Sequence, residues 1–160
     1  VKKKLGDLPV IAEDLGFLTP RVHRLLRKSG FPGMKVLQFA FGSGNDNNYL
    51  PHNYNKNCVV YTGTHDNDTI NGWLETVSHA DLEFAKKYLH TKNENIREEL
   101  IISAMSSVAN TCILTMQDLI GLGSSARMNI PSTVGGNWMW RAKPDYITEE
   151  IKETHSDLTE

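Results

Sequence analysis

The sequence lacks the features that define several common protein classes. It has only two cysteines, Cys58 and Cys112, and neither lies in a CxxC or another metal-ligand spacing. Two isolated thiols argue against a disulfide framework and indicate a reducing compartment. No apolar run approaches the length of a membrane span, and no segment resembles a signal peptide. We therefore expect a cytoplasmic protein without a membrane partner.

No excess of one charge is present either. The chain has 17 Lys and Arg against 19 Asp and Glu, which argues against nucleic acid as its main partner. We interpret the short basic run at residues 2–4 as a solvated face. The length and the 39% hydrophobic content predict a single domain over residues 1–160. Because the chain opens with Val1 and not methionine, we expect a piece of something longer.

Apolar segments alternate with helical patterns along the chain. Strands are predicted at residues 8–12, 34–39, 58–62 and 111–116, and helices at 20–29, near 68, at 78–89, at 95–110 and from about 148. This order predicts an α/β fold with a parallel sheet. The polar loop 42–57 is long for a plain connector, so we expect it to have a functional or lid role. A full (β/α)8 barrel needs about 250 residues, so half a barrel or a small open sheet fits.

Polar side chains follow each predicted strand at its carboxyl end. They are Glu13 and Asp14, Gln38, His65 and Asp66, and Gln117 and Asp118. Parallel folds build their sites at this edge. Glu13 and Asp66 at one mouth would suit glycoside chemistry, in which one carboxyl group protonates the leaving oxygen and another supports the charged transition state. His65 would bind a sugar hydroxyl. Apolar ring faces for sugars are offered by Trp73, Trp138, Trp140, Tyr49 and Tyr54.

Other interpretations of the same residues stay open at this point. His65, Asp66 and Asp68 are also hard ligands that suit a metal-dependent hydrolase. Carboxylates at strand ends often cap a helix or pair with a buried arginine, and we interpret Asp68 as a helix cap. Single tryptophans belong to a core more often than to a sugar platform.

Several longer segments resemble one known family. LPVIAEDLGFLTPRV, FPGMKVLQFAF, LPHNY, VVYTGTHDNDT, ARMNIP and GNWMWR, in this order from about Leu8 to Arg141, are similar to the amylomaltases. These are 4-α-glucanotransferases of glycoside hydrolase family 77. The resemblance implies the C-terminal half of a (β/α)8 TIM barrel. It also implies retaining transfer between α-1,4-glucans such as maltooligosaccharides, with no cofactor and no metal.

The resemblance also implies roles for individual residues. Glu13 in IAEDLG corresponds to the general acid/base, and Asp66 in GTHDND to the carboxylate that stabilises the transition state. His65 corresponds to a donor-sugar ligand, and Asn137 and Trp138 to residues near the acceptor. The family's nucleophilic aspartate lies in a motif resembling RIDHFRG, which this sequence lacks. We therefore expect no turnover by the chain alone.

Two consequences follow from the missing motif. The chain would be one part of a glucanotransferase, or alternatively a glucan-binding half-barrel without turnover. A half-barrel leaves strand edges and an apolar inner face uncovered, so we expect the isolated chain to self-associate. Gly42 is a further departure, because the family often has an acidic residue at this position.

Overall fold

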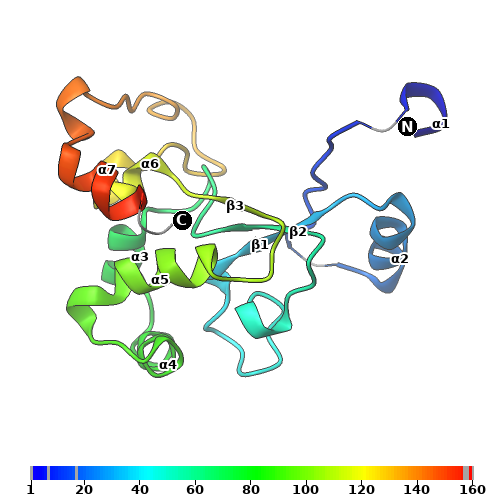
Figure 1. The fold of residues 1–160 in the computed structure, drawn as a ribbon, viewed down its shortest axis with the longest axis horizontal. Coiled ribbons are helices and arrows are strands. Elements are labelled where there is room, and N and C mark those ends of the chain that lie inside the picture. Colours follow the sequence, from blue (N-terminus) through cyan, green and yellow to red (C-terminus); the bar gives the residue numbers. More distant parts are fainter. Residues whose placement is uncertain (1, 7, 17, 157–158, 160) are drawn as a thin grey trace.

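A parallel sheet lies at the centre of the molecule (Figure 1). The computed structural model describes residues 2–6, 8–16, 18–156 and 159. Within them, β1 (Gly33–Val36), β2 (Cys58–Tyr61) and β3 (Thr111–Ile113) form a sheet in the order β1-β2-β3. Both pairs are parallel, with Gly33 opposite Cys58 and Val59 opposite Thr111. The predicted α/β fold with a parallel sheet is therefore confirmed.

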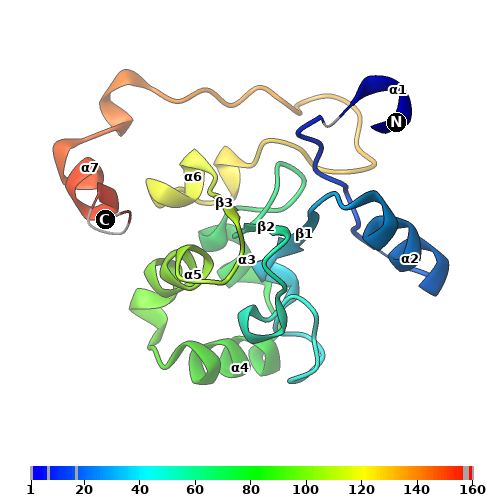
Figure 2. The ribbon, with the colours of Figure 1, turned by 45° about the vertical axis from the view of Figure 1, so that its right-hand side comes forward.

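Helices cover one side of this sheet. Figure 2 shows α3 (Ile70–Thr76), α4 (His79–Leu89) and α5 (Ile96–Met105) below the strands. Their apolar faces enclose a core that includes Leu37, Leu50, Val60, Ile70, Ile96, Leu100 and Ile101, each at most 2% exposed. After β3 the chain forms α6 (Met116–Leu119), crosses a long irregular segment and ends in α7 (Glu149–Ser156). Burial of the β2 side chains fits a central parallel strand.

Short polar side chains define where the core helices begin. The Thr69 hydroxyl accepts a hydrogen bond from the Gly72 amide at 3.0 Å, which starts α3. The Ser78 hydroxyl likewise accepts from the Asp81 amide at 3.1 Å, which starts α4. Within the described residues, no helix combines the length and the apolar content that crossing a membrane would require.

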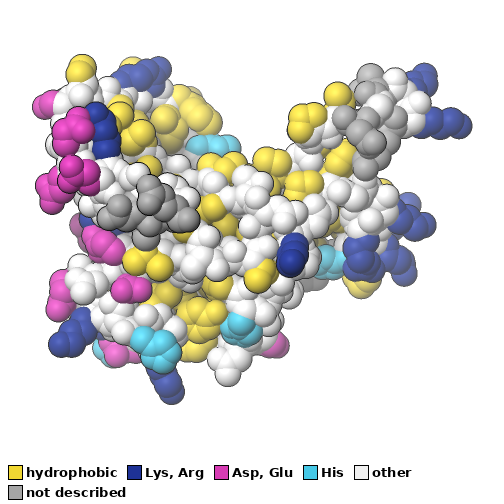
Figure 3. All heavy atoms as spheres, in the orientation of Figure 1, with side chains coloured by type: hydrophobic (Ala, Val, Ile, Leu, Met, Phe, Trp, Pro, Cys, Tyr) yellow, Lys and Arg dark blue, Asp and Glu magenta, His cyan; other side chains and the backbone are white. Residues whose placement is uncertain are grey.

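The N-terminal part forms an arm that projects from this body (Figure 1). It carries α1 (Lys2–Leu5) and α2 (Pro20–Ser29), and Gly30 ends α2 in the left-handed conformation. The structure describes α2 throughout, and the helix buries none of its residues. Figure 3 shows Lys and Arg side chains gathered around α2 and acidic side chains on the opposite side, near α7. The arm therefore exposes both its basic and its apolar side chains.

The predicted strand at residues 8–12 is wrong. This segment runs beside the start of β1, and the Ala12 amide donates to the Pro32 carbonyl at 2.9 Å. A ladder needs a repeated series of amide donors, and the prolines Pro9 and Pro32 have none. Within the run, the Val10 amide instead donates to the Leu8 carbonyl at 2.9 Å in a tight local turn, so the segment forms no strand.

Two further strands end earlier than their apolar runs. β1 stops at Val36, and Leu37–Phe39 forms a 3-10 turn. β3 stops at Ile113, because the Thr115 hydroxyl accepts from the Asp118 amide and starts α6. Helix α5 likewise ends at Met105, before the predicted residue 110. In each case a capping or turn contact ends an element that hydrophobicity alone would extend.

Candidate active site

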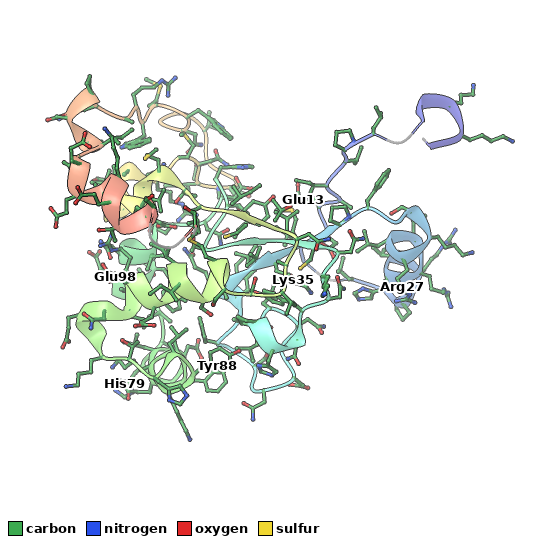
Figure 4. All side chains as sticks on the ribbon, viewed as in Figure 1. Glu13, Arg27, Lys35, His79, Tyr88 and Glu98 are labelled. Atoms are coloured by element: carbon green, nitrogen blue, oxygen red, sulfur yellow. The ribbon has the colours of Figure 1, made fainter. Side chains whose placement is uncertain are left out.

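An open cavity of about 950 Å3 lies at the carboxyl ends of the strands. Its lining includes Phe39 after β1, the loop 63–67 after β2 and Thr115 after β3. Glu13 reaches it from the N-terminal arm, at the point where the arm meets the sheet (Figure 4). His65 and Asp66 line the same cavity, so the structure places them and Glu13 around one space. The volume is typical of sites for small molecules.

Asp66 is held by the segment that follows α6. Its Oδ1 accepts from Asn129 Nδ2 at 2.6 Å and lies 3.3 Å from His65 Nε2. Its main-chain oxygen accepts from Arg127 Nη2 at 2.6 Å. The Asp66 side chain remains 46% exposed, so one carboxylate face is open to a ligand.

Trp138 and Asn137 are not part of the cavity lining, and they differ in their surroundings. The Trp138 ring is 5.0 Å from the His65 ring, and its amide donates to the Met128 carbonyl at 2.7 Å. Its φ of 63° is unusual for a bulky residue and marks a backbone held by its neighbours. The Asn137 side chain instead accepts from the Ile130 amide and donates to the Thr133 hydroxyl. The Asn137 side chain therefore stabilises the loop 130–137 to which it belongs.

Asp14 and Asp118 also follow predicted strands but bind the protein itself. Asp14 Oδ1 accepts from the Met34 amide at 2.6 Å. Asp118 is 1% exposed, and its carboxylate accepts from Thr62 Oγ1 at 2.6 Å and from the Ile70 amide at 2.7 Å. Burial raises the pKa of Asp118 despite these hydrogen bonds. Both carboxylates connect elements of the fold.

Asp68 is not among the residues that line the cavity, and its interpretation as a helix cap is wrong. Thr69 caps α3, while Asp68 accepts from the Thr69 amide at 2.8 Å and from the Ser124 hydroxyl at 2.8 Å. Among the described residues, no three His, Cys, Asp or Glu side chains are grouped so as to hold a metal ion. His65, Asp66 and Asp68 thus do not converge as the metal alternative requires.

One of the five aromatic candidates lines the cavity, and a second contacts a residue that lines it. Tyr49 lines it, and Trp138 contacts His65. Trp73 instead packs against Phe41 in the core, with ring centres 6.0 Å apart. The remaining two are Tyr54, which is buried and donates to the Tyr49 carbonyl, and Trp140, which stacks on Tyr146. The loop 42–57 therefore contributes Tyr49 to the cavity wall.

Neither thiol is placed for catalysis. Cys58 and Cys112 are both free thiols. Cys58 is buried, and Cys112 is partly buried. Burial raises the pKa of Cys112 to about 11, and it also raises the pKa of Cys58. Both side chains therefore stay protonated near neutral pH, where a thiol is a poor nucleophile.

Gly72 allows α3 to pack closely against Asp68 and Ser124, and we expect its replacement to disturb this packing. A Cβ at this position would lie 2.5 Å from Asp68 Oδ1 and would also strike the Ser124 hydroxyl. Gly72→Ala should lower the free energy of unfolding by about 1–2 kcal/mol, because overpacking outweighs the better helix propensity of alanine. Urea unfolding measures this. Gly123→Ala is the matched control, since no atom lies within 4 Å of its Cβ position. Equal stability of both variants would contradict the prediction.

The fold places this candidate site at the carboxyl edge of a parallel sheet, and comparisons with known proteins identify the family. The family model described as 4-alpha-glucanotransferase matches residues 1–148. The chain therefore belongs to the 4-alpha-glucanotransferase family, as its motifs predicted.

Individual relatives agree with this assignment. The chain is 52% identical to a 4-alpha-glucanotransferase of Clostridium butyricum, over 99% of this chain and 33% of that protein. It is 51% identical to a chloroplastic/amyloplastic 4-alpha-glucanotransferase of Arabidopsis thaliana, over 98% of this chain and 27% of that protein. A solved structure of amylomaltase from Streptococcus agalactiae in complex with acarbose superposes with a TM-score of 0.94 at 43% identity, covering 99% of this chain and 32% of that one. The chain thus spans about a third or less of the length of these proteins.

Proposed function

We propose that this chain is the part of a 4-α-glucanotransferase that carries the acid/base and the transition-state stabiliser. One observation carries the proposal: Glu13, His65 and Asp66 line one cavity at the carboxyl edge of the sheet, in a chain of this family. The proposed substrates are α-1,4-glucans, which the acarbose complex of the related amylomaltase supports. The proposed wider architecture is a (β/α)8 barrel, of which this chain would form the C-terminal half.

The proposed chemistry divides the work between two carboxyl groups of this chain. Glu13, protonated, gives its proton to the glycosidic oxygen as the bond to the donor sugar breaks. Asp66 stabilises the positive charge that develops on that sugar, and His65 binds one of its hydroxyls. The covalent intermediate forms on a carboxylate outside this chain. Glu13 then takes the proton of the acceptor 4-hydroxyl as the new bond forms.

Location is a further part of the proposal. Cys58 and Cys112 are free thiols, which supports a cytoplasmic protein in a reducing compartment.

A chimeric enzyme tests the proposed function. This chain would replace the matching third of the Clostridium butyricum enzyme, to which it is 52% identical over 161 residues. Incubation with maltotriose should give glucose and a ladder of longer glucans, separated by chromatography. The unmodified Clostridium enzyme is the positive control. A folded chimera that produces no ladder would refute the assignment of Glu13 and Asp66 to transfer.

A binding module without turnover is the second candidate. The absence of a motif resembling RIDHFRG favours it for the isolated chain. Under this alternative the chain binds maltooligosaccharides, measured by calorimetry, and forms no product. If the chimera transfers glucans and the isolated chain only binds them, the chain is part of a transferase in the complete enzyme and a binding module on its own.

Self-association of the isolated chain is a separate prediction. Leu8, Ile11, Val22 and Leu25 are between 40% and 67% exposed on the N-terminal arm, and the β3 residues Thr111 and Ile113 are exposed at the sheet edge. Such surfaces pair with other chains. We expect light scattering to show a mass that rises with concentration, and Leu25→Lys to weaken this rise. A constant monomer mass at all concentrations would contradict the prediction.

A further inference from the structure

One guanidinium group connects the Asp66 loop to the segment after α6. Arg127 Nη2 donates to the Asp66 carbonyl at 2.6 Å, and Arg127 Nε donates to the Asn129 carbonyl at 2.9 Å. Arg127 Nη1 lies 3.9 Å from Asp68 Oδ2. The Arg127 side chain is 24% exposed, so these contacts are partly shielded from solvent. A single planar group therefore fixes three points on two loops.

The two loops meet again at the carboxylate itself. Asn129 Nδ2 donates to Asp66 Oδ1 at 2.6 Å, and the Asn129 amide donates to the His65 carbonyl at 3.1 Å. Arg127 thus holds the main chain of Asp66 and also the residue that orients its side chain. Asp68 completes the frame, because the Ser124 hydroxyl and the Thr69 amide hold its carboxylate in place.

Arg127 does not face the cavity in which a sugar would lie. It lines an adjoining recess of about 20 Å3, together with Asp68 and Gln117, and this recess shares Thr64, His65, Asn67 and Thr115 with the cavity. A space of this size holds about one water molecule. Any effect of Arg127 on the reaction must therefore pass through the residues it holds.

We propose that Arg127 is a positioning residue, whose bridge between Asp66, Asn129 and Asp68 sets the direction of the Asp66 carboxylate in the cavity. The proposal rests on the proposed function of Asp66. Lysine cannot replace this group, because an ammonium group lacks the planar fork that reaches several acceptors at once. Displacing a catalytic group by about 1 Å costs about a hundredfold in rate, whereas sugar binding by other contacts is retained.

The first test uses kinetics of the chimera. Arg127→Lys should lower kcat for maltotriose transfer by about 10- to 100-fold, with KM changed by less than about threefold. Arg97→Lys is the matched control, because Arg97 also donates to main-chain carbonyls, those of Asp118 and Leu119, at 3.0 and 3.2 Å. It should leave kcat unchanged. If Arg127→Lys changes kcat no more than Arg97→Lys does, the proposal is overturned.

The second test does not need turnover. In 1H–15N spectra of this chain, Arg127→Lys should shift the amide signals of His65, Asp66 and Asn67, and Arg97→Lys should leave them in place. Unchanged signals in Arg127→Lys overturn the positioning role. Shifted signals in a chimera without transfer support positioning and refute the proposed function instead. If Arg127→Lys does not fold, Asn129→Ser removes the side-chain contact to Asp66 and should produce the same loss of kcat and the same shifts.

Discussion

Replacing Asp118 with alanine is expected to lower the free energy of unfolding by about 3 kcal/mol. Asp118 is 1% exposed and accepts hydrogen bonds from the Thr62 hydroxyl and the Ile70 amide. Alanine would leave both buried donors without a partner, at a cost of about 1–3 kcal/mol each. These two contacts join the end of β2 to the start of α3, so their loss would loosen the loop that carries Asp66. Urea unfolding at pH 7 measures the change.

Asp118→Asn separates the hydrogen bonds from the charge. The asparagine oxygen can accept from the Ile70 amide, and its amide can donate to the Thr62 oxygen, so we expect a change below about 1 kcal/mol at acidic pH. Burial raises the pKa of Asp118 from its ordinary value of 3.8. Folding therefore favours the protonated form, and the stability that this group contributes is complete below pH 3.8 and is lost as pH rises through the folded pKa.

The stability of the asparagine variant relative to the parent chain should therefore improve from acidic to neutral pH. Asn lacks the ionisation that burial disfavours in Asp118. Unfolding curves at several pH values between about 4 and 8 test this, since the range begins near the ordinary pKa of the carboxyl group. If the stability difference between Asp118→Asn and the parent chain did not change with pH, burial would not raise the pKa of Asp118.

Glu13→Gln is expected to lower transfer by the chimera about 10²- to 10⁴-fold. Glutamine matches the shape of glutamate but cannot give a proton to the glycosidic oxygen, and general acid catalysis supplies rate factors of this size. Glu13 is exposed on the arm where it borders the cavity, so the substitution should leave the fold unchanged. Chromatography of maltotriose products gives the rate.

Glu75→Gln is the matched control for this substitution. Glu75 is also exposed, lies near the end of α3 and does not line the cavity with Glu13. Its transfer rate should equal that of the unmodified chimera. A Glu13→Gln rate within threefold of the control would show that another group is the proton donor, since loss of a general acid costs far more than about threefold.

The sequence predicts the sheet well where apolar runs and capping residues agree. The run at 58–62 becomes β2, and Ser78 marks the start of α4. It fails at residues 8–12, where prolines remove the amide donors that a strand needs. The boundary between β3 and α6 was also unpredictable from hydrophobicity, because one hydroxyl, that of Thr115, decides it. Local patterns thus predict that an element exists, and single hydrogen bonds decide its ends.

In the candidate site, too, local sequence patterns predict some features and tertiary hydrogen bonds decide others. Glu13 and Asp66 are both expected at this edge, and both line the cavity, but only Asp66 follows a strand, because residues 8–12 form none. Arg127 and Asn129 lie within the ARMNIP segment, but their contacts with Asp66 depend on the tertiary structure. The hydrogen bonds span 61 and 63 residues, and no periodicity in the chain indicates them.

The long separation between Asp66 and its partner has a consequence for the newly made protein. A ribosome adds about 5–20 residues per second, so the 63 residues from Asp66 to Asn129 take roughly 3–13 s to synthesise. β3 also emerges late, because Val59 pairs with Thr111. The nascent chain therefore exposes an unfinished sheet and an unanchored Asp66 loop for seconds. During that interval the edge of β2 that β3 will cover is open to pairing with other chains.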